Sequence, residues 1–272
     1  MERSSESTQR DVIRLFPSLL LCGLLAVLAL GGLGCASMGG SSGPVLRVGI
    51  SPDYPPVAFE REGEIVGIEA DLASIMASRL GRRLRFERYA FEDLIGALEQ
   101  GEIDVVMSGM SITPEREDRI RFTETYMEVG QLTLIRTSDI ARFGRPQSIR
   151  RAGARVGYER GTTGEEFVAA RLGRADSFGF DDIDSGIRSL RANRIDYFVH
   201  DAPTIWRMAG DPSHRDLHGL YKPLTREYLA WAVHRNDGVL LTQLNATLAD
   251  LKREGLIEPV VDRWIPVRIT IP

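Results

Sequence analysis

The chain has 272 residues, of which 43% are hydrophobic and 26% are charged, so it can form one large domain or two smaller ones with real cores. Its formal net charge of −4 argues against a general nucleic-acid binder, which would carry a basic total and a basic face. Positive charge is almost all arginine, with lysine only at Lys222 and Lys252. A single arginine therefore carries little information until its context is known.

Residues 1–34 predict an export signal. Residues 15–33 are almost all apolar, follow three arginines and precede a run rich in Gly and Ser, residues 36–44. The hexapeptide "LGGLGC", residues 30–35, resembles the lipobox of bacterial lipoproteins, although Gly32 stands where that pattern has leucine. The resemblance implies a lipid on Cys35 and a tether over residues 35–44. The alternative is an uncleaved membrane anchor, because the apolar run is nearly long enough to span a bilayer.

Metal and thiol chemistry find little support in the rest of the chain. The only cysteines are Cys22 and Cys35, so the body from Pro44 onward has no disulfide, thiol nucleophile or cysteine ligand. His214 and His218 have the spacing of a metal-binding pair on a helix, but turn-forming residues surround both. We expect no metal site and no cofactor.

The first half of the body reads as alternating strands and helices. Short β-like runs lie at Leu46–Ile50, Leu84–Tyr89 and Ile103–Met107, and helical spacing of apolar residues marks 68–81 and 94–101. The resulting order, β-α-β-α-β, predicts an α/β lobe with a mostly parallel sheet.

A second series begins near Arg155 and repeats the pattern as strand, helix, helix and strand. The segments "LIGALEQGEIDVVMSGM" and "GIRSLRANRIDYFVHDA" each contain an amphipathic helix, a turn, an Ile-Asp pair, an apolar run and small polar residues. We interpret this as two lobes built alike. An amphipathic helix in the segment 238–255 and a shorter one over residues 257–264 close the chain.

Polar segments follow three of the predicted strands: "SGMSITPER", "ERGTTGEE" and "VHDAP". Ligands of open parallel sheets bind at the carboxyl ends of the strands. Arg116 could hold a carboxylate bidentately, and the amides of Gly161, Thr162 and Thr163 could bind an anion before a helix. Asp201 could pair with an ammonium group. Opposite charges at neighbouring strand ends predict a receptor for an α-amino acid.

Residues 46–266 resemble the family of extracytoplasmic solute-binding proteins that serve polar amino acid ABC transporters. The matching segments are "ISPDYPPVAF", "VGIEADLASIMASRLG", "DLIGALEQGEIDVVMSGMSITPERE", "FTETY", "VGYERGTTGEE", "NRIDYFVHDAP" and "LKREGLIEPVVDRWIP". The resemblance implies the two-lobed periplasmic-binding-protein fold, in which two hinge strands join lobes of mostly parallel sheet flanked by helices. It places lobe 1 at 45–130 and 227–268 and lobe 2 at 131–226.

The same resemblance implies a ligand site between the lobes. Arg116 would hold the α-carboxylate and Asp201 the α-ammonium. The Ser111 hydroxyl, the Gly109 backbone and the Thr163 amide would help Arg116 to hold the α-carboxylate. The other implied contacts are Thr162, the aromatic walls Tyr54 and Phe91, and Ser51 and Glu159 near the ligand side chain. His200 beside Asp201 resembles a glutamine-binding member. Glu69 and Ser51 depart from the family pattern, which has aspartate at both places in many members, so a known specificity does not transfer.

Simpler structural roles compete with these assignments. Arg116 lies in a charge run that could be a solvated helix face, and Asp201 could only cap the helix that begins near Pro203. Tyr54 could cover the turn at the following prolines, and Phe91 could belong to a core.

The resemblance implies a monomeric binding protein that is not an enzyme and that works with an ABC permease supplied in trans. A periplasmic enzyme similar to cyclohexadienyl dehydratase, with Glu159 or His200 as general acid, is one alternative. A ligand-sensing domain is another. The pairing of Arg116 with Asp201 suits a zwitterion and favours the binding protein, with a polar or cationic amino acid as ligand.

Overall fold

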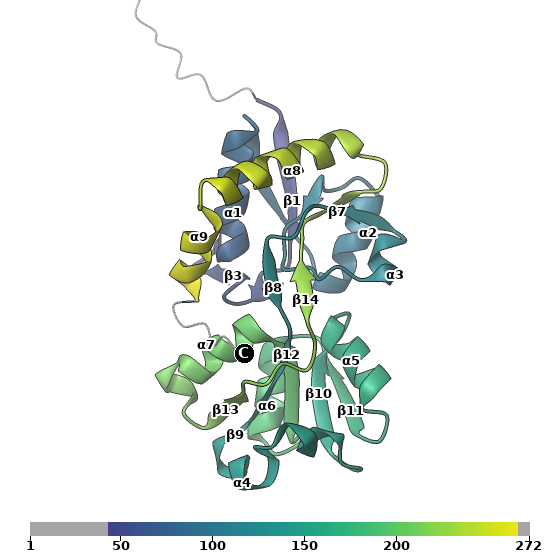
Figure 1. Ribbon diagram of the computed structural model, residues 1–272, viewed down its shortest axis with the longest axis vertical. Coiled ribbons are helices and arrows are strands. Elements are labelled where there is room, and N and C mark those ends of the chain that lie inside the picture. The colour runs from purple at the N-terminus through teal and green to yellow at the C-terminus, as the bar shows by residue number, and fades with distance from the viewer. Residues whose placement is uncertain (1–42, 266–272) are drawn as a thin grey trace, which may run out of the picture. The chain divides into compact units, whose positions relative to one another are not determined.

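Two five-stranded sheets organise the chain in the computed structural model, which describes residues 43–265 (Figure 1). The predicted export signal, Cys35 and most of the tether lie outside the described residues. The sheet of lobe 1 has the order β5 (Arg83–Arg88), β1 (Val45–Ile50), β6 (Val105–Val106), β15 (Ala232–His234), β7 (Ile120–Phe122). The sheet of lobe 2 has the order β11 (Asp176–Phe180), β10 (Arg155–Glu159), β12 (Tyr197–Asp201), β9 (Gln131–Arg136), β13 (Leu217–Leu220).

Each sheet has one reversed strand, in the fourth position of its order. β15 pairs antiparallel with both neighbours in lobe 1, and β9 does the same in lobe 2, while the pairs among the first three strands are parallel. Both reversed strands follow a hinge strand in the chain, so they begin where the lobes meet. The parallel strands therefore end there, and their polar carboxyl-terminal segments face the junction between the lobes.

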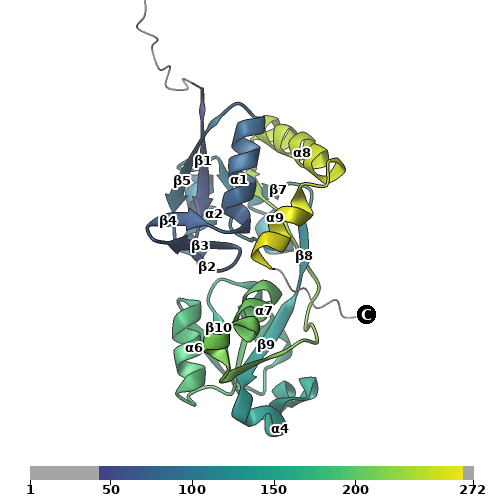
Figure 2. The ribbon, with the colours of Figure 1, turned by 90° about the vertical axis from the view of Figure 1, so that its left-hand side faces the viewer.

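Helices cover both faces of each sheet (Figures 1 and 2). Along β6, Val105 packs in the cluster that contains α1 (Ile68–Arg79) and α8 (Gly238–Arg253), and Val106 packs in the cluster that contains α2 (Leu94–Glu99). This alternation follows from the two-residue period of a strand buried on both faces. The helices of lobe 1 are α1 (Ile68–Arg79), α2 (Leu94–Glu99), α3 (Pro114–Glu117), α8 (Gly238–Arg253) and α9 (Ile257–Trp264). Those of lobe 2 are α4 (Ile140–Phe143), α5 (Thr163–Arg171), α6 (Ile183–Arg191) and α7 (Ala202–Gly210).

Two antiparallel strands connect the lobes. β8 (Met127–Val129) carries the chain out of lobe 1, and β14 (Glu227–Leu229) carries it back, with Glu227 opposite Val129. They run side by side between the sheets in Figure 1. A small sheet of β2 (Asp53–Tyr54), β3 (Ala58–Arg61) and β4 (Glu64–Val66) follows β1. The fold is the two-lobed α/β architecture with two hinge strands that the sequence predicted.

The similarity between the two lobes has a physical basis in a repeated arginine–aspartate pair. In lobe 1, Arg47 of β1 donates from its backbone amide (2.7 Å) and its guanidinium (2.5 Å) to Asp104, the aspartate of the Ile-Asp pair. In lobe 2, Arg155 of β10 makes the same two bonds to Asp196, at 3.1 and 2.6 Å. Each guanidinium also donates to a carbonyl in the preceding turn. The Ile-Asp pair therefore fixes the turn between helix and strand in both lobes.

Several element predictions needed correction. The second lobe has a strand, β11, between the two predicted helices, and its sequence "DSFGF" lacks the apolar run of a buried strand. The strand expected at Ile103–Met107 is reduced to Val105–Val106. In contrast, α8 buries the leucines at 240, 241, 244, 248 and 251, as its amphipathic spacing indicated.

Candidate functional site

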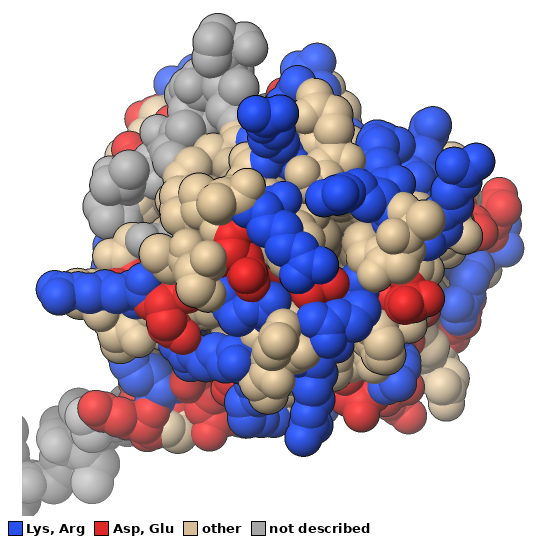
Figure 3. Space-filling model, turned by 90° about the horizontal axis from the view of Figure 1, so that it is seen from below, with Lys and Arg blue, Asp and Glu red and all other residues tan. Residues whose placement is uncertain are grey.

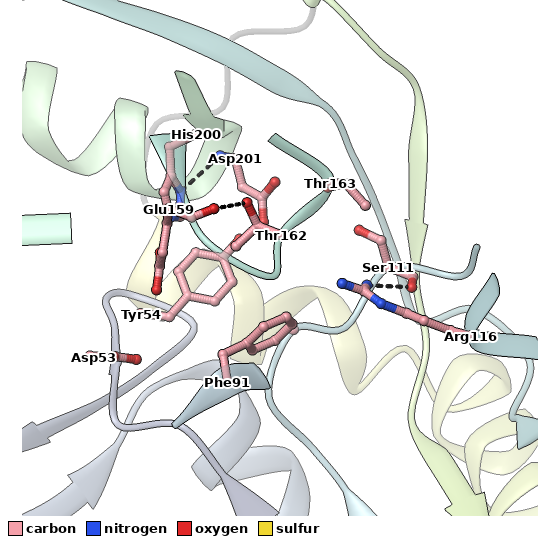
Figure 4. A pocket seen from close by; sticks show the side chains of 11 residues that line it. Asp53, Tyr54, Phe91, Ser111, Arg116, Glu159, Thr162, Thr163, His200 and Asp201 are labelled. Atoms are coloured by element: carbon pink, nitrogen blue, oxygen red, sulfur yellow. Dashed lines mark hydrogen bonds and ion pairs between the residues drawn. The ribbon is translucent and has the colours of Figure 1, made fainter. Parts of the chain in front are cut away.

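A small pocket lies at the junction of the lobes, where the parallel strands of both sheets end (Figure 4). Its volume of ≈ 20 Å³ is enough for about one water molecule. A larger cavity of ≈ 450 Å³ adjoins it and shares Phe91, Arg116 and Thr162 with it. The lining residues of the small pocket are Asp53, Tyr54, Phe91, Gly109, Ser111, Arg116, Glu159, Thr162, Thr163, His200 and Asp201.

The structure brings nine of the ten predicted contact residues into this lining, and Ser51 is the exception. Ser51 is buried, and its hydroxyl donates to Asp53 over 2.8 Å. Ser51 therefore positions a lining residue without lining the pocket itself. Asp53 itself lines the pocket, although sequence reasoning did not single it out. Its place next to Tyr54, within the quoted segment "ISPDYPP", was the available signal.

Arg116 is a buried cation and not part of a solvated helix face. Only 8% of the residue is exposed, whereas many arginines of the chain lie on the surface, as the face in Figure 3 shows. Thr113 caps the four-residue helix α3 by accepting from the Arg116 amide. The Arg116 guanidinium donates to the Ser111 carbonyl (2.9 Å) and, across the junction, to the Gly161 carbonyl (3.0 Å). Burial lowers the pKa of Arg116 below its ordinary value, but an arginine remains charged in proteins.

Aromatic rings form the wall on the lobe 1 side. The Arg116 guanidinium lies 5.4 Å from the centre of the Phe91 ring, within the range of a cation–π contact. Tyr54 approaches the backbone of Gly109 so closely that a Cβ atom there would lie 2.6 Å from the Tyr54 ring. Gly109 also has φ of +66°, a conformation that favours glycine. The glycine is therefore required for the strand end to meet the ring.

Glu69 lies behind this strand end, fully buried in lobe 1 and outside the pocket lining. Its carboxylate accepts from the Gly109 amide (2.7 Å), the Tyr126 hydroxyl (2.8 Å) and the Trp231 indole N–H (2.9 Å). Burial raises the pKa of Glu69 to about 7, although these three donors lower it. The glutamate therefore holds the Gly109 segment from the core of lobe 1.

The Glu69→Gln variant is expected to lower the free energy of unfolding by about 1–3 kcal/mol, because the new amide nitrogen cannot accept from Trp231. Since Glu69 keeps its proton in the folded state up to about pH 7, its contribution to stability falls as pH rises from its unfolded pKa to about 7. The contribution of Glu69 should therefore make the free energy of unfolding in urea lower at pH 8 than at pH 5 in the wild type. The variant should lack this contribution. Glu64→Gln on the exposed side of β4 is the matched control. Equal stability of Glu69→Gln and wild type would contradict the assignment.

Asp201 ends β12 and stands at the N-cap position of α7, but its side chain makes no capping hydrogen bond. Its carboxylate instead accepts from the Tyr54 hydroxyl across the junction (2.5 Å) and from the Gln131 amide group. Burial raises the pKa of Asp201 to about 6; the nearby His200 lowers it and Glu227 raises it further. The capping alternative does not describe this residue.

His200 and Glu159 form a buried pair on the side of the pocket away from Arg116 (Figure 4). The Asp201 amide donates to His200 Nδ1 over 2.8 Å, so Nδ1 carries no proton in this arrangement. The ring proton therefore lies on Nε2, 2.8 Å from a Glu159 oxygen. Burial lowers the pKa of His200, but Glu159, Asp201 and Asp53 together raise it by more, so the net shift is upward. With its proton on Nε2 alone, His200 is neutral in this hydrogen-bond arrangement.

Thr162 and Thr163 stand at the start of α5, and their hydroxyls have different partners. Thr162 holds the N-cap position, and its hydroxyl donates to the Glu159 carbonyl (2.7 Å). The Thr163 hydroxyl donates to Glu227 of the hinge strand β14 (2.6 Å). Gln131 and Glu227 are neighbours of the pocket that sequence reasoning missed, because both lie at strand starts without a local motif.

Comparison with known proteins places the chain in a family. Residues 46–267 match the model of bacterial extracellular solute-binding proteins, family 3, and the chain belongs to this family. It is 28% identical over 239 residues to the ABC transporter arginine-binding protein 1 of Escherichia coli K12, covering 85% of this chain and 94% of that protein. It thus shares a family with proteins that act outside the cytoplasm.

Two solved structures resemble the fold. One is a binding component of an ABC transporter from Wolinella succinogenes, complexed with lysine, with a TM-score of 0.77, 27% identity, and coverage of 81% of this chain and 95% of that one. The other is an ancestral amino acid-binding protein, a precursor of cyclohexadienyl dehydratase, with a TM-score of 0.75, 28% identity, and coverage of 81% and 95%.

The described part of the chain has neither a membrane-spanning helix nor a metal-binding cluster. Among residues 43–265 there is no helix with the length and apolar character needed to cross a membrane. The same residues contain no cluster of histidine and acidic side chains suited to a metal ion, and His214 and His218 lie on different elements, η4 (Pro212–His214) and β13.

Proposed function

We propose that the protein binds a cationic L-α-amino acid between its lobes and delivers it to an ABC permease. The observation that carries this proposal is the order of charges along one pocket (Figure 4). Arg116 lies at one side, Asp201 in the middle, and Glu159 with His200 at the other side. The three groups on the α-carbon of an amino acid, namely the carboxylate, the ammonium and the side chain, can each meet one of these three parts of the pocket.

The excess of carboxylates supports a positively charged side chain. An α-amino acid head group uses one cation, Arg116, and one anion, Asp201. Two more carboxylates, Asp53 and Glu159, line the same pocket. Because His200 is neutral in the hydrogen-bond pattern described, these two charges are not balanced by it. Arginine-binding and lysine-bound relatives agree with this choice.

Binding and lobe closure are a single equilibrium in this proposal. Arg116, Ser111 and Tyr54 belong to lobe 1, whereas Asp201, Thr163 and Glu159 belong to lobe 2. A space of ≈ 20 Å³ does not admit an amino acid, so the ligand enters when the lobes move apart about the hinge strands. The ligand then favours closure through contacts that need both lobes together. We take residues 45–130 with 227–268 and residues 131–226 as the two rigid bodies, of which residues 266–268 lie outside the described part of the chain.

We further propose that a lipid on Cys35 keeps the protein near its permease and that it acts as a monomer. The sequence "LGGLGC" supports the anchor, and a pocket built from a single chain supports the monomer. Cys35→Ser should abolish incorporation of labelled palmitate, which the wild type should show. A wild type that stays with the membrane without incorporating palmitate would point to the uncleaved anchor.

A thermal-shift screen of the compact unit that begins at Gly43 tests the ligand. An amino acid at about 100 times its dissociation constant should stabilise the fold by roughly 2.7 kcal/mol. We expect L-arginine, L-lysine or L-histidine to raise the melting temperature at concentrations where L-glutamate does not. Stabilisation by L-glutamate alone would overturn the cationic assignment.

We propose that the protein is not an enzyme. An elimination reaction on a prephenate-like acid needs a general acid, and Glu159 is engaged with His200 while Asp201 is suited to an ammonium group that such a substrate lacks. Incubation with prephenate should leave its absorbance unchanged. Conversion of prephenate would favour the dehydratase alternative.

A further inference from the structure

Glu227, on the hinge strand β14, gathers hydroxyl groups from both lobes. Its Oε2 accepts from the Ser111 hydroxyl of lobe 1 (2.7 Å) and from the Thr163 hydroxyl of lobe 2 (2.6 Å). Its Oε1 accepts from the hydroxyl of Thr225, two residues earlier (2.5 Å). Glu227 is not part of the pocket lining, whereas Ser111 and Thr163 are.

These hydrogen bonds determine whether the two hydroxyls donate or accept toward the pocket. An ionised carboxylate only accepts hydrogen bonds, and a hydroxyl has a single proton to donate. Since Ser111 and Thr163 give their protons to Glu227, only oxygen lone pairs remain for a ligand. Such oxygens can accept from an ammonium group and cannot donate to a carboxylate. The sequence had assigned the Ser111 hydroxyl to the ligand carboxylate.

The donors and acceptors of this hydrogen-bond network are also fixed as far as Asp201. The Gln131 amide group donates to the Thr163 hydroxyl oxygen (3.0 Å) and to Asp201. Gln131 is 1% exposed, and its Oε1 atom has no hydrogen-bond partner, so the orientation of the amide is set by its two acceptors. Glu227 and Asp201 thus stand at the two ends of one chain of hydrogen bonds.

We propose that Glu227 is a positioning residue that makes the Ser111 and Thr163 hydroxyls acceptors for the ligand ammonium group and joins both lobes to the hinge at that point. The inference rests on the proposed function. It assigns to Glu227 a preference for ligands with an α-ammonium over otherwise identical acids. The α-carboxylate is left to Arg116 and to backbone amides.

The test compares L-arginine with 5-guanidinopentanoic acid, which lacks only the α-amino group, by isothermal titration of the wild type and by thermal shift at millimolar concentration for weaker binding. Glu227→Gln should weaken the binding of L-arginine at least tenfold and change the affinity for the acid less than threefold. The reason is that a glutamine amide can donate to the two hydroxyls, which would then donate to the ligand instead of accepting from it. The matched control is Glu128→Gln on the neighbouring hinge strand β8, where the exposed glutamate pairs with Arg226. It should change neither affinity.

Equal weakening of both ligands by Glu227→Gln would indicate a purely structural role and overturn the inference, as would an L-arginine affinity within threefold of wild type. If Glu227→Gln does not fold, Ser111→Ala decides: it must weaken L-arginine and spare the acid, and any other result overturns the inference. Binding of L-arginine by the wild type tests the proposed function separately, so the two failures are distinguishable.

Discussion

Arg116→Ala is expected to weaken amino acid binding by about 2–5 kcal/mol, or roughly 30-fold to several thousand-fold, because it removes the buried cation that we propose as the partner of the ligand carboxylate. Arg116 is 8% exposed as a residue, so solvent does not replace its charge well. The variant also loses the hydrogen bond to the Gly161 carbonyl, which spans the junction of the lobes. Isothermal titration with the amino acid found in the thermal-shift screen measures the loss.

Arg121→Ala provides the matched control for this variant. Arg121 lies five residues further on, in β7, and is exposed. It should bind the ligand like the wild type. The assignment of Arg116 is wrong if Arg116→Ala retains a folded melting transition and an affinity within about threefold of wild type, since a charge-assisted contact is worth more than about 1.5 kcal/mol.

Asp201→Asn should cause a loss of similar size, because an amide cannot balance the ligand ammonium group. The pH profile of the wild type provides a second measurement. Burial raises the pKa of Asp201 to about 6, and the ammonium group pairs only with its ionised form. The contribution of Asp201 to affinity should therefore be complete well above pH 6 and fall as pH decreases through that value. For a cationic ligand, protonation of the nearby His200 lowers affinity in the same direction and begins at a higher pH, because the pKa of His200 is raised.

The variant Asp201→Asn should bind weakly at every pH and lose most of this profile. Asp176→Asn, at the exposed start of β11 in the same sheet, is the control and should keep both affinity and profile. An affinity that stays constant from pH 5 to pH 8 in the wild type would show that Asp201 does not pair with the ligand.

Local patterns in the sequence were sufficient for most of the fold. The leucine spacing of α8 and the paired segments around Asp104 and Asp196 depend on residues a few positions apart, and the structure has the elements they predict. The strand β11 was missed because its residues are mostly exposed or half-buried and lack a strand's apolar pattern. Glu69 was assigned no role because its three donors come from segments 40, 57 and 162 residues away.

By itself, the sequence determined the candidate charges of the site: Arg116 and Asp201 follow predicted strands, and parallel strands present their carboxyl ends on one side of a sheet. Only the tertiary structure decided how the polar groups are used. In the folded chain, Asp201 does not cap its helix but accepts from Tyr54, 147 residues earlier. Likewise, Glu227 lies within hydrogen-bonding distance of Ser111, 116 residues earlier. Hydrogen-bond direction depends on which donors and acceptors meet in space, and residues so far apart in the chain meet only when both sheets and the hinge have formed.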